Sequence, residues 1–339
     1  MRAADVQTFL RTLTPVKIAN AARVVSSYHW SRRTRRPVQW GLPFNMSVEP
    51  TTTCNLGCPE CPSGLRNFTR PTGTLDMDLY HKLLDEHGHR LLWLYFYFQG
   101  EPYLHPRFLD LVREASRRNI YSVTSTNAHF LTERTARQTV ESGLSRIILS
   151  LDGTTQDVYE QYRKGGTMQK VVDGAKRLVA AKKELGSTTP HIILQFLVVG
   201  PNEHQIDDVR RLGTEIGVDE VKFKTAQIYD YENGNPLIPT NEKYSRYRRN
   251  DDGTYSIKNP LHDHCWKLWH SCVMTWDGRI VPCCFDKDAQ YTMGSLADSD
   301  LRTIWWNERY ARFRERLLSG RREIDICRNC TEGLRVWME

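Results

Sequence analysis

Three cysteines lie close together near the beginning of the chain. Cys54, Cys58 and Cys61 occur in the stretch TTTCNLGCPECPSG with the spacing C-x3-C-x2-C. A structural zinc site takes four ligands and a disulfide takes two, whereas three thiolates leave a metal centre with one open coordination position. Thiolates bind iron–sulfur clusters as well as zinc, and an open position is where a small molecule binds. The spacing therefore predicts a cluster that takes part in chemistry, with a zinc site that borrows a fourth ligand as the alternative.

A second group of cysteines lies in the last quarter of the chain. Cys265 and Cys283 stand on either side of a Trp-Asp-Gly turn, and Cys327 and Cys330 follow with the spacing C-x2-C. Four thiolates in this arrangement hold either a structural zinc ion or a [4Fe–4S] cluster. Because Cys284 directly follows Cys283, the sequence does not decide which of these two thiols is the ligand.

Length and composition narrow the class of protein that carries these cysteines. The chain has 339 residues, of which 40% are hydrophobic, and this length suits a barrel with a smaller second unit. Asp5 and Arg11 interrupt the apolar segment that a signal peptide requires, and no apolar run reaches the roughly 18 residues of a membrane-spanning helix. In a reducing cytosol, clustered cysteines are more often metal ligands than disulfides. We therefore expect a cytoplasmic protein with metal-bound cysteines.

The elements that must position the first cysteine group are strands that alternate with amphipathic helices. The expected strands cover residues 45–50, 91–98, 120–126, 145–153, 191–199 and 218–226, and the expected helices cover residues 76–89, 106–118, 132–142, 169–185 and 203–216. This alternation predicts parallel strands with right-handed crossovers, in a partial (β/α)6 TIM-type barrel of the α/β class. Loops that follow the strands carry the chemistry in such barrels, and the cysteine loop follows the first strand.

The chain divides into four segments by composition. Residues 1–44 form a basic N-terminal extension, and residues 45–229 form the barrel core. Residues 230–264 are polar and rich in turn residues, as in a linker or lid, and residues 265–339 form a small cysteine-rich domain. The basic charge is local, because residues 1–45 hold eight Lys or Arg and one acid, which accounts for the whole net charge of +7.

The C-x3-C-x2-C spacing after a first strand resembles the radical S-adenosylmethionine (radical SAM) family, and the resemblance runs from about Asn45 to the end of the chain. It implies a [4Fe–4S] cluster on the three cysteines, with one iron that chelates the amino and carboxylate groups of S-adenosylmethionine. One-electron reduction, by a partner such as flavodoxin or ferredoxin, then cleaves the sulfonium, and the 5′-deoxyadenosyl radical abstracts a hydrogen from the substrate. The resemblance leaves open whether that substrate is a small molecule, a carbohydrate or a peptide.

The resemblance also implies residues that contact the cofactor. FQGEP resembles the Gly-Gly-Glu motif of the family, in which Gly100 lets the backbone approach the methionine amino group and Glu101 offers it a carboxylate. Further contacts are expected from Asn127 in TSTNA, Ser150 in SLDG, Arg163 in YEQYRKGG, which would bind the methionine carboxylate, and Gln195 in IILQFLVV, which would reach the ribose. The alternatives are a solvated loop acid at Glu101, a helix-surface cation at Arg163 and a contact with a polar neighbour at Gln195. Glu60 departs from the family pattern, since an aromatic residue often precedes the third cysteine and stacks near adenine.

The C-terminal cysteines resemble the auxiliary-cluster extensions called SPASM and twitch domains, because DGRIVPC matches their G-x4-C motif. This resemblance implies a second [4Fe–4S] cluster, with Cys265, Cys283, Cys327 and Cys330 as its ligands. A cluster that the protein ligates fully is able to accept an electron from a substrate radical, which predicts a net two-electron oxidation. Peptide or carbohydrate modification stays open as the outcome.

Two other residues are candidates for contact with the substrate. Some radical SAM epimerases quench a substrate radical with a cysteine hydrogen, and Cys272 is the candidate for that role; a small buried residue is the plainer interpretation. Lys224 lies near the end of the last expected strand, on the same face as Lys222. It is a candidate substrate contact, with a solvated cation as the alternative.

The N-terminal extension carries a separate expectation. SRRTRRP holds four arginines, Arg32, Arg33, Arg35 and Arg36, and apolar residues with helical spacing precede them. Such a segment binds an anionic membrane surface or an acidic partner through its arginines, while its apolar face is expected to pack against the barrel. A non-enzymatic zinc-binding scaffold or nucleic-acid-binding protein would explain the cysteines and the arginines but not the motifs at the strand ends. We therefore expect an enzyme, and nucleic acid is not the expected partner.

Overall fold

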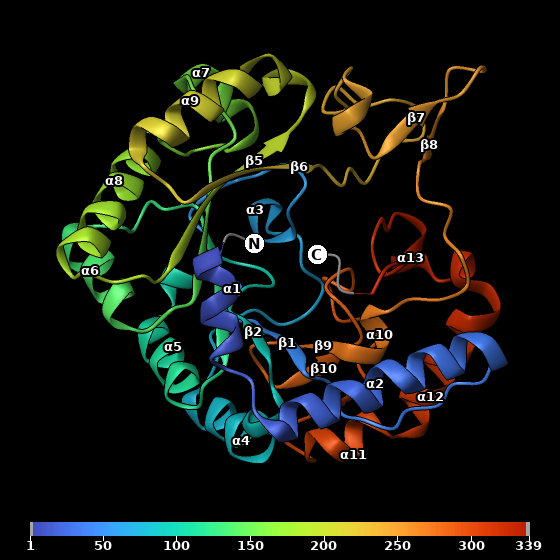
Figure 1. The fold of residues 1–339 in the computed structure, drawn as a ribbon. Helices are drawn as coiled ribbons and strands as arrows, with labels where there is room; N and C mark the ends of the chain where they lie inside the picture. Colours follow the sequence, from blue (N-terminus) through green and yellow to red (C-terminus); the bar gives the residue numbers. More distant parts are fainter. Residues whose placement is uncertain (1–2, 337–339) are drawn as a thin grey trace.

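Six parallel strands form the barrel core of the computed structural model, which describes residues 3–336. They run in the order β1 to β6, and every neighbouring pair is parallel. Their bounds are β1 Asn45–Val48, β2 Trp93–Tyr95, β3 Tyr121–Thr126, β4 Arg146–Ser150, β5 His191–Val198 and β6 Glu220–Thr225. The helices around them are α4 Met77–His87, α5 Phe108–Arg117, α6 Glu133–Glu141, α7 Gln156–Tyr162, α8 Met168–Glu184 and α9 Ile206–Ile216. Figure 1 shows these helices as an arc outside the strands, so the predicted partial (β/α)6 barrel is confirmed.

Local sequence signals set the ends of these helices. Helix α4 begins after Asp76, whose carboxylate accepts a hydrogen bond from the amide of Asp78, and α6 begins after Thr132, whose hydroxyl accepts one from the amide of Thr135. Helix α9 ends at Gly217, whose φ of 84° favours glycine. Helix α5 buries the apolar face that its spacing predicts, which consists of Phe108, Leu111, Val112 and Ala115.

Two expected elements differ from the structure in extent. The strand expected at residues 91–98 is regular only over β2, because the chain leaves the sheet to form a turn with a positive φ at Gly100. The helix expected at residues 203–216 begins as a 3-10 turn, Gly200–Gln205, and becomes α-helical at Ile206. The loop after β4 also contains α7, a helix that the sequence pattern did not predict.

The C-terminal region extends the barrel sheet. Strand β9 (Ser271–Met274) pairs with β1 in parallel, and β10 (Arg279–Val281) and β11 (Gly294–Ser295) follow in antiparallel pairing. The result is one nine-stranded sheet in the order β11-β10-β9-β1-β2-β3-β4-β5-β6. The helices of this region are α10 Lys267–His270, α11 Leu301–Trp305, α12 Glu308–Gly320 and α13 Asp325–Arg328. The predicted segment boundaries after residues 229 and 264 stay predictions.

The segment of residues 230–264, expected to be a linker or lid, contains a short hairpin. Its strands β7 (Tyr247–Arg249) and β8 (Tyr255–Ile257) pair in antiparallel and form a sheet of their own. Tyr247 is buried, and its hydroxyl donates a hydrogen bond of 2.9 Å to the side-chain oxygen of Asn329. The hairpin is therefore held against the C-terminal region.

The N-terminal extension begins with helix α1 (Ala3–Leu10), which lies at the end of the barrel where the strands start. Asp5 is buried and forms an ion pair with Arg146, the first residue of β4. Phe9 stacks on Trp93, the first residue of β2, with 4.3 Å between the ring centroids. This helix therefore covers the barrel end opposite the cysteine loop (Figure 1).

Helix α2 (Pro15–Thr34) continues the extension along the C-terminal region. The hydroxyl of Tyr28 lies 2.9 Å from Nδ1 of His264. The expected packing of an apolar face is found only in part, because Tyr28 is buried while Ile18 and Trp30 are each 53% exposed. Among residues 3–336, no helix is both long enough and apolar enough to cross a lipid bilayer. The cytoplasmic location stays a prediction.

Candidate functional site

The three-cysteine loop follows β1, at the end of the barrel where the strands finish. Cys61 stands at the start of the short helix α3 (Pro62–Leu65), and its amide donates to the carbonyl of Cys58 at 3.3 Å. The amide of Leu56 lies 3.5 Å from the Sγ of Cys54. All three cysteines pack in one cluster with Leu56. The structure thus brings together the three cysteines that the sequence selects.

Burial disfavours free thiolates in this loop. It raises the pKa of Cys54 to about 11, and it also raises the pKa of Cys58. Arg163 opposes this effect, because its Nη1 lies 3.8 Å from the Sγ of Cys58, while its Nε pairs with Asp152 at 2.5 Å. A bound metal centre stabilises as thiolates those thiols whose burial makes ionisation costly.

The turn after β2 places Gly100 and Glu101 beside the cysteine loop. Gly100 has a φ of 75°, and a Cβ atom there would lie 2.1 Å from the carbonyl oxygen of Thr51, so only glycine fits. Its amide donates to the hydroxyl of Ser63 at 2.8 Å, just after Cys61. This bond ties the turn directly to the cysteine loop.

Glu101 is a buried carboxylate held by three donors. It accepts hydrogen bonds from the hydroxyl of Thr126 at 2.7 Å and from the amides of Asn127 at 2.8 Å and Tyr103 at 3.2 Å. Burial raises its pKa, and these hydrogen bonds lower it. At 2% exposure Glu101 is not a solvated loop acid.

The other predicted cofactor residues lie at the same end of the sheet. The amide group of Asn127 donates to the side-chain oxygen of Asn55, in the cysteine loop, at 2.8 Å. Ser150 ends β4 and is opposite Gln195 of β5 in the strand register. Arg163 follows α7 and reaches Cys58, so it is no surface cation. The structure therefore places all six predicted cofactor residues along one edge, which are Gly100, Glu101, Asn127, Ser150, Arg163 and Gln195.

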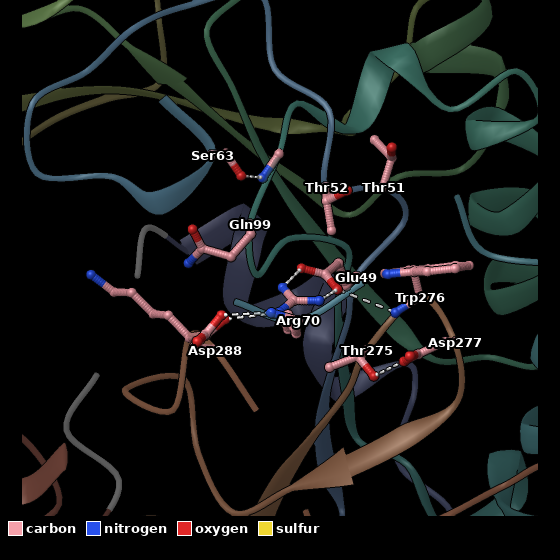
Figure 2. Close-up of polar contacts among 12 residues, drawn as sticks. Glu49, Thr51, Thr52, Ser63, Arg70, Gln99, Thr275, Trp276, Asp277 and Asp288 are labelled. Atoms are coloured by element: carbon pink, nitrogen blue, oxygen red, sulfur yellow. Dashed lines mark hydrogen bonds and ion pairs between the residues drawn. The ribbon is translucent and has the colours of Figure 1, made fainter. Parts of the chain in front are cut away.

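A buried ion pair joins the cysteine loop to the C-terminal region, and the sequence analysis did not find it. Figure 2 shows Arg70 held by both carboxylate oxygens of Glu49, at 2.6 and 2.8 Å. The amide of Trp276 donates to the same carboxylate at 3.2 Å, and the amide of Arg70 donates to Asp288 at 3.3 Å. The Nε of Arg70 also donates to the carbonyl of Lys287 at 3.0 Å. Glu49 directly follows β1, but no sequence signal indicates that its partner stands 21 residues later.

The four auxiliary cysteines also come together, from segments far apart in the chain. Burial, and to a smaller extent the nearby thiol of Cys265, raises the pKa of Cys327 and of Cys330 to about 12. Burial also raises the pKa of Cys283, and the nearby thiols of Cys284, Cys327 and Cys330 add to that effect. Cys284 instead packs against a small apolar cluster on β9 and β10. This arrangement favours Cys283 over Cys284 as the fourth ligand.

A cavity of about 350 Å³ is lined by residues that are neighbours of both cysteine groups in the sequence, and by none of the cysteines themselves. Its lining comes from the segment after Cys61, from the loop after β6 and from the C-terminal region, and consists of Pro62, Asn67, Gln227, Tyr229, Phe285, Asp286, Lys287, Asp288, Gln290, Asp325, Ile326 and Asn329. Lys287 donates to the hydroxyl of Tyr229 at 2.7 Å. Burial lowers the pKa of Lys287, and the thiols of Cys61 and Cys284 partly oppose that effect. We call this space the inter-site cavity.

Glu60, the departure from the family pattern, shapes the rim of the inter-site cavity. Its carboxylate accepts a hydrogen bond of 2.9 Å from the amide of Tyr229. Burial raises the pKa of Glu60, and this hydrogen bond and the charge of Lys287 lower it. The side chain before the third cysteine therefore fixes the loop after β6 against the cysteine loop.

Cys272 and Lys224 do not line the inter-site cavity. Cys272 is 1% exposed on β9 and lines a separate, smaller cavity of about 150 Å³ with Tyr97, Cys283 and Cys284. Burial raises its pKa, so the thiol stays protonated. Lys224 lies on β6 with an exposed side chain. A role for either residue stays a prediction.

Comparison with known proteins agrees with this geometry. The family model of the radical SAM superfamily matches residues 48–213, and that of the SPASM iron–sulfur cluster-binding domain matches residues 265–331. The chain belongs to the radical SAM superfamily and carries a C-terminal SPASM domain. It is therefore an iron–sulfur enzyme that uses S-adenosylmethionine, and the alternative of a zinc-binding scaffold or nucleic-acid-binding protein is set aside.

Two characterised relatives cover most of the chain. The tungsten-containing aldehyde ferredoxin oxidoreductase cofactor-modifying protein of Pyrococcus furiosus is 29% identical over 300 residues, which are 79% of this chain and 82% of the relative. The PqqA peptide cyclase of Gluconobacter oxydans is 26% identical over 258 residues, which are 71% of this chain and 70% of the relative. Both relatives modify another molecule, as their names state.

Solved structures support the fold. BtrN in complex with AdoMet and 2-DOIA is 21% identical with a TM-score of 0.54, and the match covers 86% of this chain and 94% of BtrN. Streptococcus suis SuiB bound to the precursor peptide SuiA is 14% identical with a TM-score of 0.62, over 93% of this chain and 75% of SuiB. At these identities the likeness concerns the fold alone.

Proposed function

We propose that the protein cleaves S-adenosylmethionine at the three-cysteine loop and abstracts a hydrogen from a substrate bound in the inter-site cavity. The observation that carries this proposal is the lining of the cavity. It begins directly after Cys61 on one side and includes neighbours of Cys327 and Cys330 on the other. A substrate held there has access to both cysteine groups.

The donor sets fit two [4Fe–4S] clusters. Cys54, Cys58 and Cys61 would hold the first, and the second would be held by Cys265, Cys283, Cys327 and Cys330. When bound, the first cluster supplies the electron that cleaves S-adenosylmethionine, and the second takes up the electron left on the substrate. In the net oxidation the substrate loses one hydrogen atom to the 5′-deoxyadenosyl radical, one electron to the auxiliary cluster and one proton to solvent. An external one-electron carrier, such as flavodoxin or ferredoxin, would supply the electron for the cleavage in its reduced form, and its oxidised form would take up the electron from the auxiliary cluster, so that the cycle balances.

Residues of the barrel edge would bind the methionine part of S-adenosylmethionine. Glu101 already accepts three hydrogen bonds, and a carboxylate has about four lone-pair sites, so one site remains for the ammonium. Arg163 uses Nε and Nη1 for Asp152 and Cys58, and its Nη2 remains for the methionine carboxylate. Asn127, at the end of β3, is fixed by its bond to Asn55 and would support the same group.

Substrate recognition falls to Lys287 and nearby neutral groups. The three aspartates of the inter-site cavity are already bonded: Asp286 accepts from the amides of Gln290 and Tyr291, Asp288 from Thr69, and Asp325 from the hydroxyl of Tyr291. Lys287, Tyr229 and the side-chain amides of the lining are left to bind oxygen atoms of a substrate. They suit a hydroxyl- or carboxylate-bearing small molecule, a carbohydrate or a peptide side chain. The likeness to the PqqA peptide cyclase supports the peptide form.

The experiment begins with anaerobic reconstitution. Two four-iron clusters predict about eight irons per chain, together with formation of 5′-deoxyadenosine from S-adenosylmethionine and a chemical reductant. Colourless protein with tightly held zinc would contradict the proposal. Substrate candidates, both hydroxyl-bearing small molecules and peptides, are then compared by the increase in 5′-deoxyadenosine that each produces.

A lysine substitution tests the cavity itself. Lys287→Met should lower the substrate-dependent rate by about tenfold or more, because a hydrogen bond to a charged group contributes about 1.5–3 kcal/mol. Lys222→Met, on the outer strand β6 and outside the cavity lining, is the matched control and should leave that rate within about twofold. Equal rates for both variants would indicate that the substrate does not bind in the inter-site cavity.

A further inference from the structure

Arg321 is a buried cation in the auxiliary region. Its exposure is 0%, and it opens the 3-10 turn between α12 and α13. Taking a charged group out of water is costly unless an opposite charge or a full set of hydrogen bonds compensates. The environment of this guanidinium therefore has to supply an acceptor for each nitrogen or a negative charge.

The hydrogen bonds of Arg321 leave that compensation incomplete. Its Nη1 donates to the carbonyl of His264 at 3.0 Å, and its Nη2 donates to the carbonyl of Glu332 at 2.8 Å. The same Nη2 lies 3.4 Å from the Sγ of Cys330. Its Nε is buried and bonds to nothing in the described part of the chain, and within residues 3–336 no carboxylate pairs with the guanidinium.

Three other arginines, of which Arg70 and Arg314 are buried and Arg163 is partly buried, show how the chain compensates such a charge. Arg70 is paired with the carboxylate of Glu49, and Arg163 is paired with that of Asp152. Arg314 lies 4.3 Å from the ring centroids of both Trp305 and Tyr310, a cation–π arrangement. Within residues 3–336 the guanidinium of Arg321 has neither device, because the carboxylate of Asp263 accepts a hydrogen bond from the backbone amide of Arg321, at 3.0 Å, and not from its side chain. The nearby groups that become anionic beside the guanidinium are the thiols of Cys265, Cys327 and Cys330.

We propose that Arg321 is the counter-charge of an iron–sulfur cluster on the auxiliary cysteines and raises the reduction potential of that cluster. The proposal rests on the proposed function in one respect, namely that these cysteines hold a cluster. The guanidinium contacts Cys330 and stands close to Cys265 and Cys327. Reduction adds one negative charge to a cluster, so a fixed positive charge and a hydrogen bond to a ligand sulfur both stabilise the reduced form. Arg321 is thus a positioning residue that makes the site a better electron acceptor.

The test compares variants that differ in the charge of residue 321 while the size of its side chain changes as little as possible. Arg321→Gln removes the charge and keeps an amide donor, and Arg321→Lys keeps the charge on a smaller donor. The midpoint potential of the auxiliary cluster is measured by redox titration with paramagnetic resonance, in full-length protein that also carries Cys54→Ala to simplify the signal. Arg321→Gln should lower the equilibrium constant for reduction at least about tenfold, which corresponds to a shift of about 59 mV to more negative potential. Arg321→Lys should shift it by less than half as much.

A control separates this electrostatic role from packing. Arg314→Gln removes another fully buried arginine of the same region, but its contacts are rings and backbone carbonyls. It should lower the thermal midpoint as much as Arg321→Gln does and shift the potential less.

Loss of the cluster from Arg321→Gln but not from Arg321→Lys would also support the counter-charge. Equal potentials for wild type and Arg321→Gln, or loss of the cluster from both Arg321 variants, would overturn it. If iron analysis finds only about four irons per wild-type chain, the proposed function is wrong, and this result is known before any Arg321 variant is made.

Discussion

The two cysteine groups solve the same chemical problem by different structural means. Cys54, Cys58 and Cys61 lie within eight residues, in a loop whose own amides and neighbours fix the thiols. The auxiliary cysteines are spread from Cys265 to Cys330 and meet only because the chain folds back on itself. One group thus depends on local hydrogen bonds and the other on tertiary structure.

The two cysteine groups also differ in whether the arginine beside them is paired with a carboxylate. Arg163 is neutralised by Asp152 before any cluster binds, so the first site gains little net positive charge from it. Arg321 has no such partner within residues 3–336, so its full charge acts on the auxiliary thiols. A site that must donate an electron to S-adenosylmethionine benefits from a low potential, and a site that accepts one benefits from a higher potential. The difference in pairing agrees with that division of roles.

Removal of a loop cysteine should have the largest effect on chemistry. Cys54→Ala, Cys58→Ala and Cys61→Ala should each abolish formation of 5′-deoxyadenosine, because each removes one of only three ligands. The fold should be spared, since the loop lies outside the barrel core. Product formation is measured by chromatography and the fold by circular dichroism. Normal product formation by all three variants would show that the loop is not the cofactor site.

Removal of an auxiliary cysteine should have the opposite effect on S-adenosylmethionine cleavage. Cys327→Ala should retain S-adenosylmethionine cleavage, lose about half of the bound iron and fail in substrate turnover. Its thermal midpoint should fall by several degrees, because a site that joins distant segments contributes folding free energy. Iron analysis and scanning calorimetry check the two parts. Full turnover with unchanged iron content would remove Cys327 from the ligand set.

The buried pair between Glu49 and Arg70 connects the two groups, and breaking it should cost stability. Glu49→Gln leaves the cation of Arg70 buried without its partner, which is expected to lower the free energy of unfolding by about 3–5 kcal/mol. Glu141→Gln is the matched control, because its pair with Arg137 is exposed and contributes about 0–1 kcal/mol. Urea denaturation measures both. Similar losses for the two variants would mean that the buried pair does not hold the regions together.

The arginines of the N-terminal extension should have the smallest effect. The structure argues against testing them by deletion of residues 1–36, because that removes the buried ion pair of Asp5 and the packing of Tyr28. Substitution of Arg32, Arg33 and Arg36 by Gln is milder, since all three side chains are exposed.

Co-sedimentation with vesicles containing anionic lipid checks this expectation. Each basic residue near an anionic surface contributes about 1 kcal/mol, and salt screens the attraction. Binding by the wild type should therefore be strongest at low salt and should weaken in the triple variant. Failure of the wild type to co-sediment at low salt would leave only an acidic protein or substrate as the partner.

The features that could be predicted from the sequence are those that depend on residues close together in the chain. The strand and helix pattern follows from apolar spacing, and the cysteine loop and the Gly100 turn are each confined to a few residues. The partners of Arg70, Arg321 and Lys287 were not predictable in this way, because each lies in a segment that reaches its neighbour only through the fold. Cys283 and Cys284 show the limit well, because they are adjacent in sequence and only the fold brings Cys283 near Cys327 and Cys330.

The pairing of β9 with β1 bears on which segments of the chain tolerate insertions and deletions. The cysteine loop follows β1 and the turn toward Cys283 follows β9, so the pairing of these two strands sets the distance between the points at which the two segments leave the sheet. The peptide that connects the regions in sequence, residues 230–264, does not set that distance. Insertions at the exposed turn of the hairpin, Asp251 and Asp252, are therefore expected to leave the relative position of the two cysteine-bearing segments unchanged.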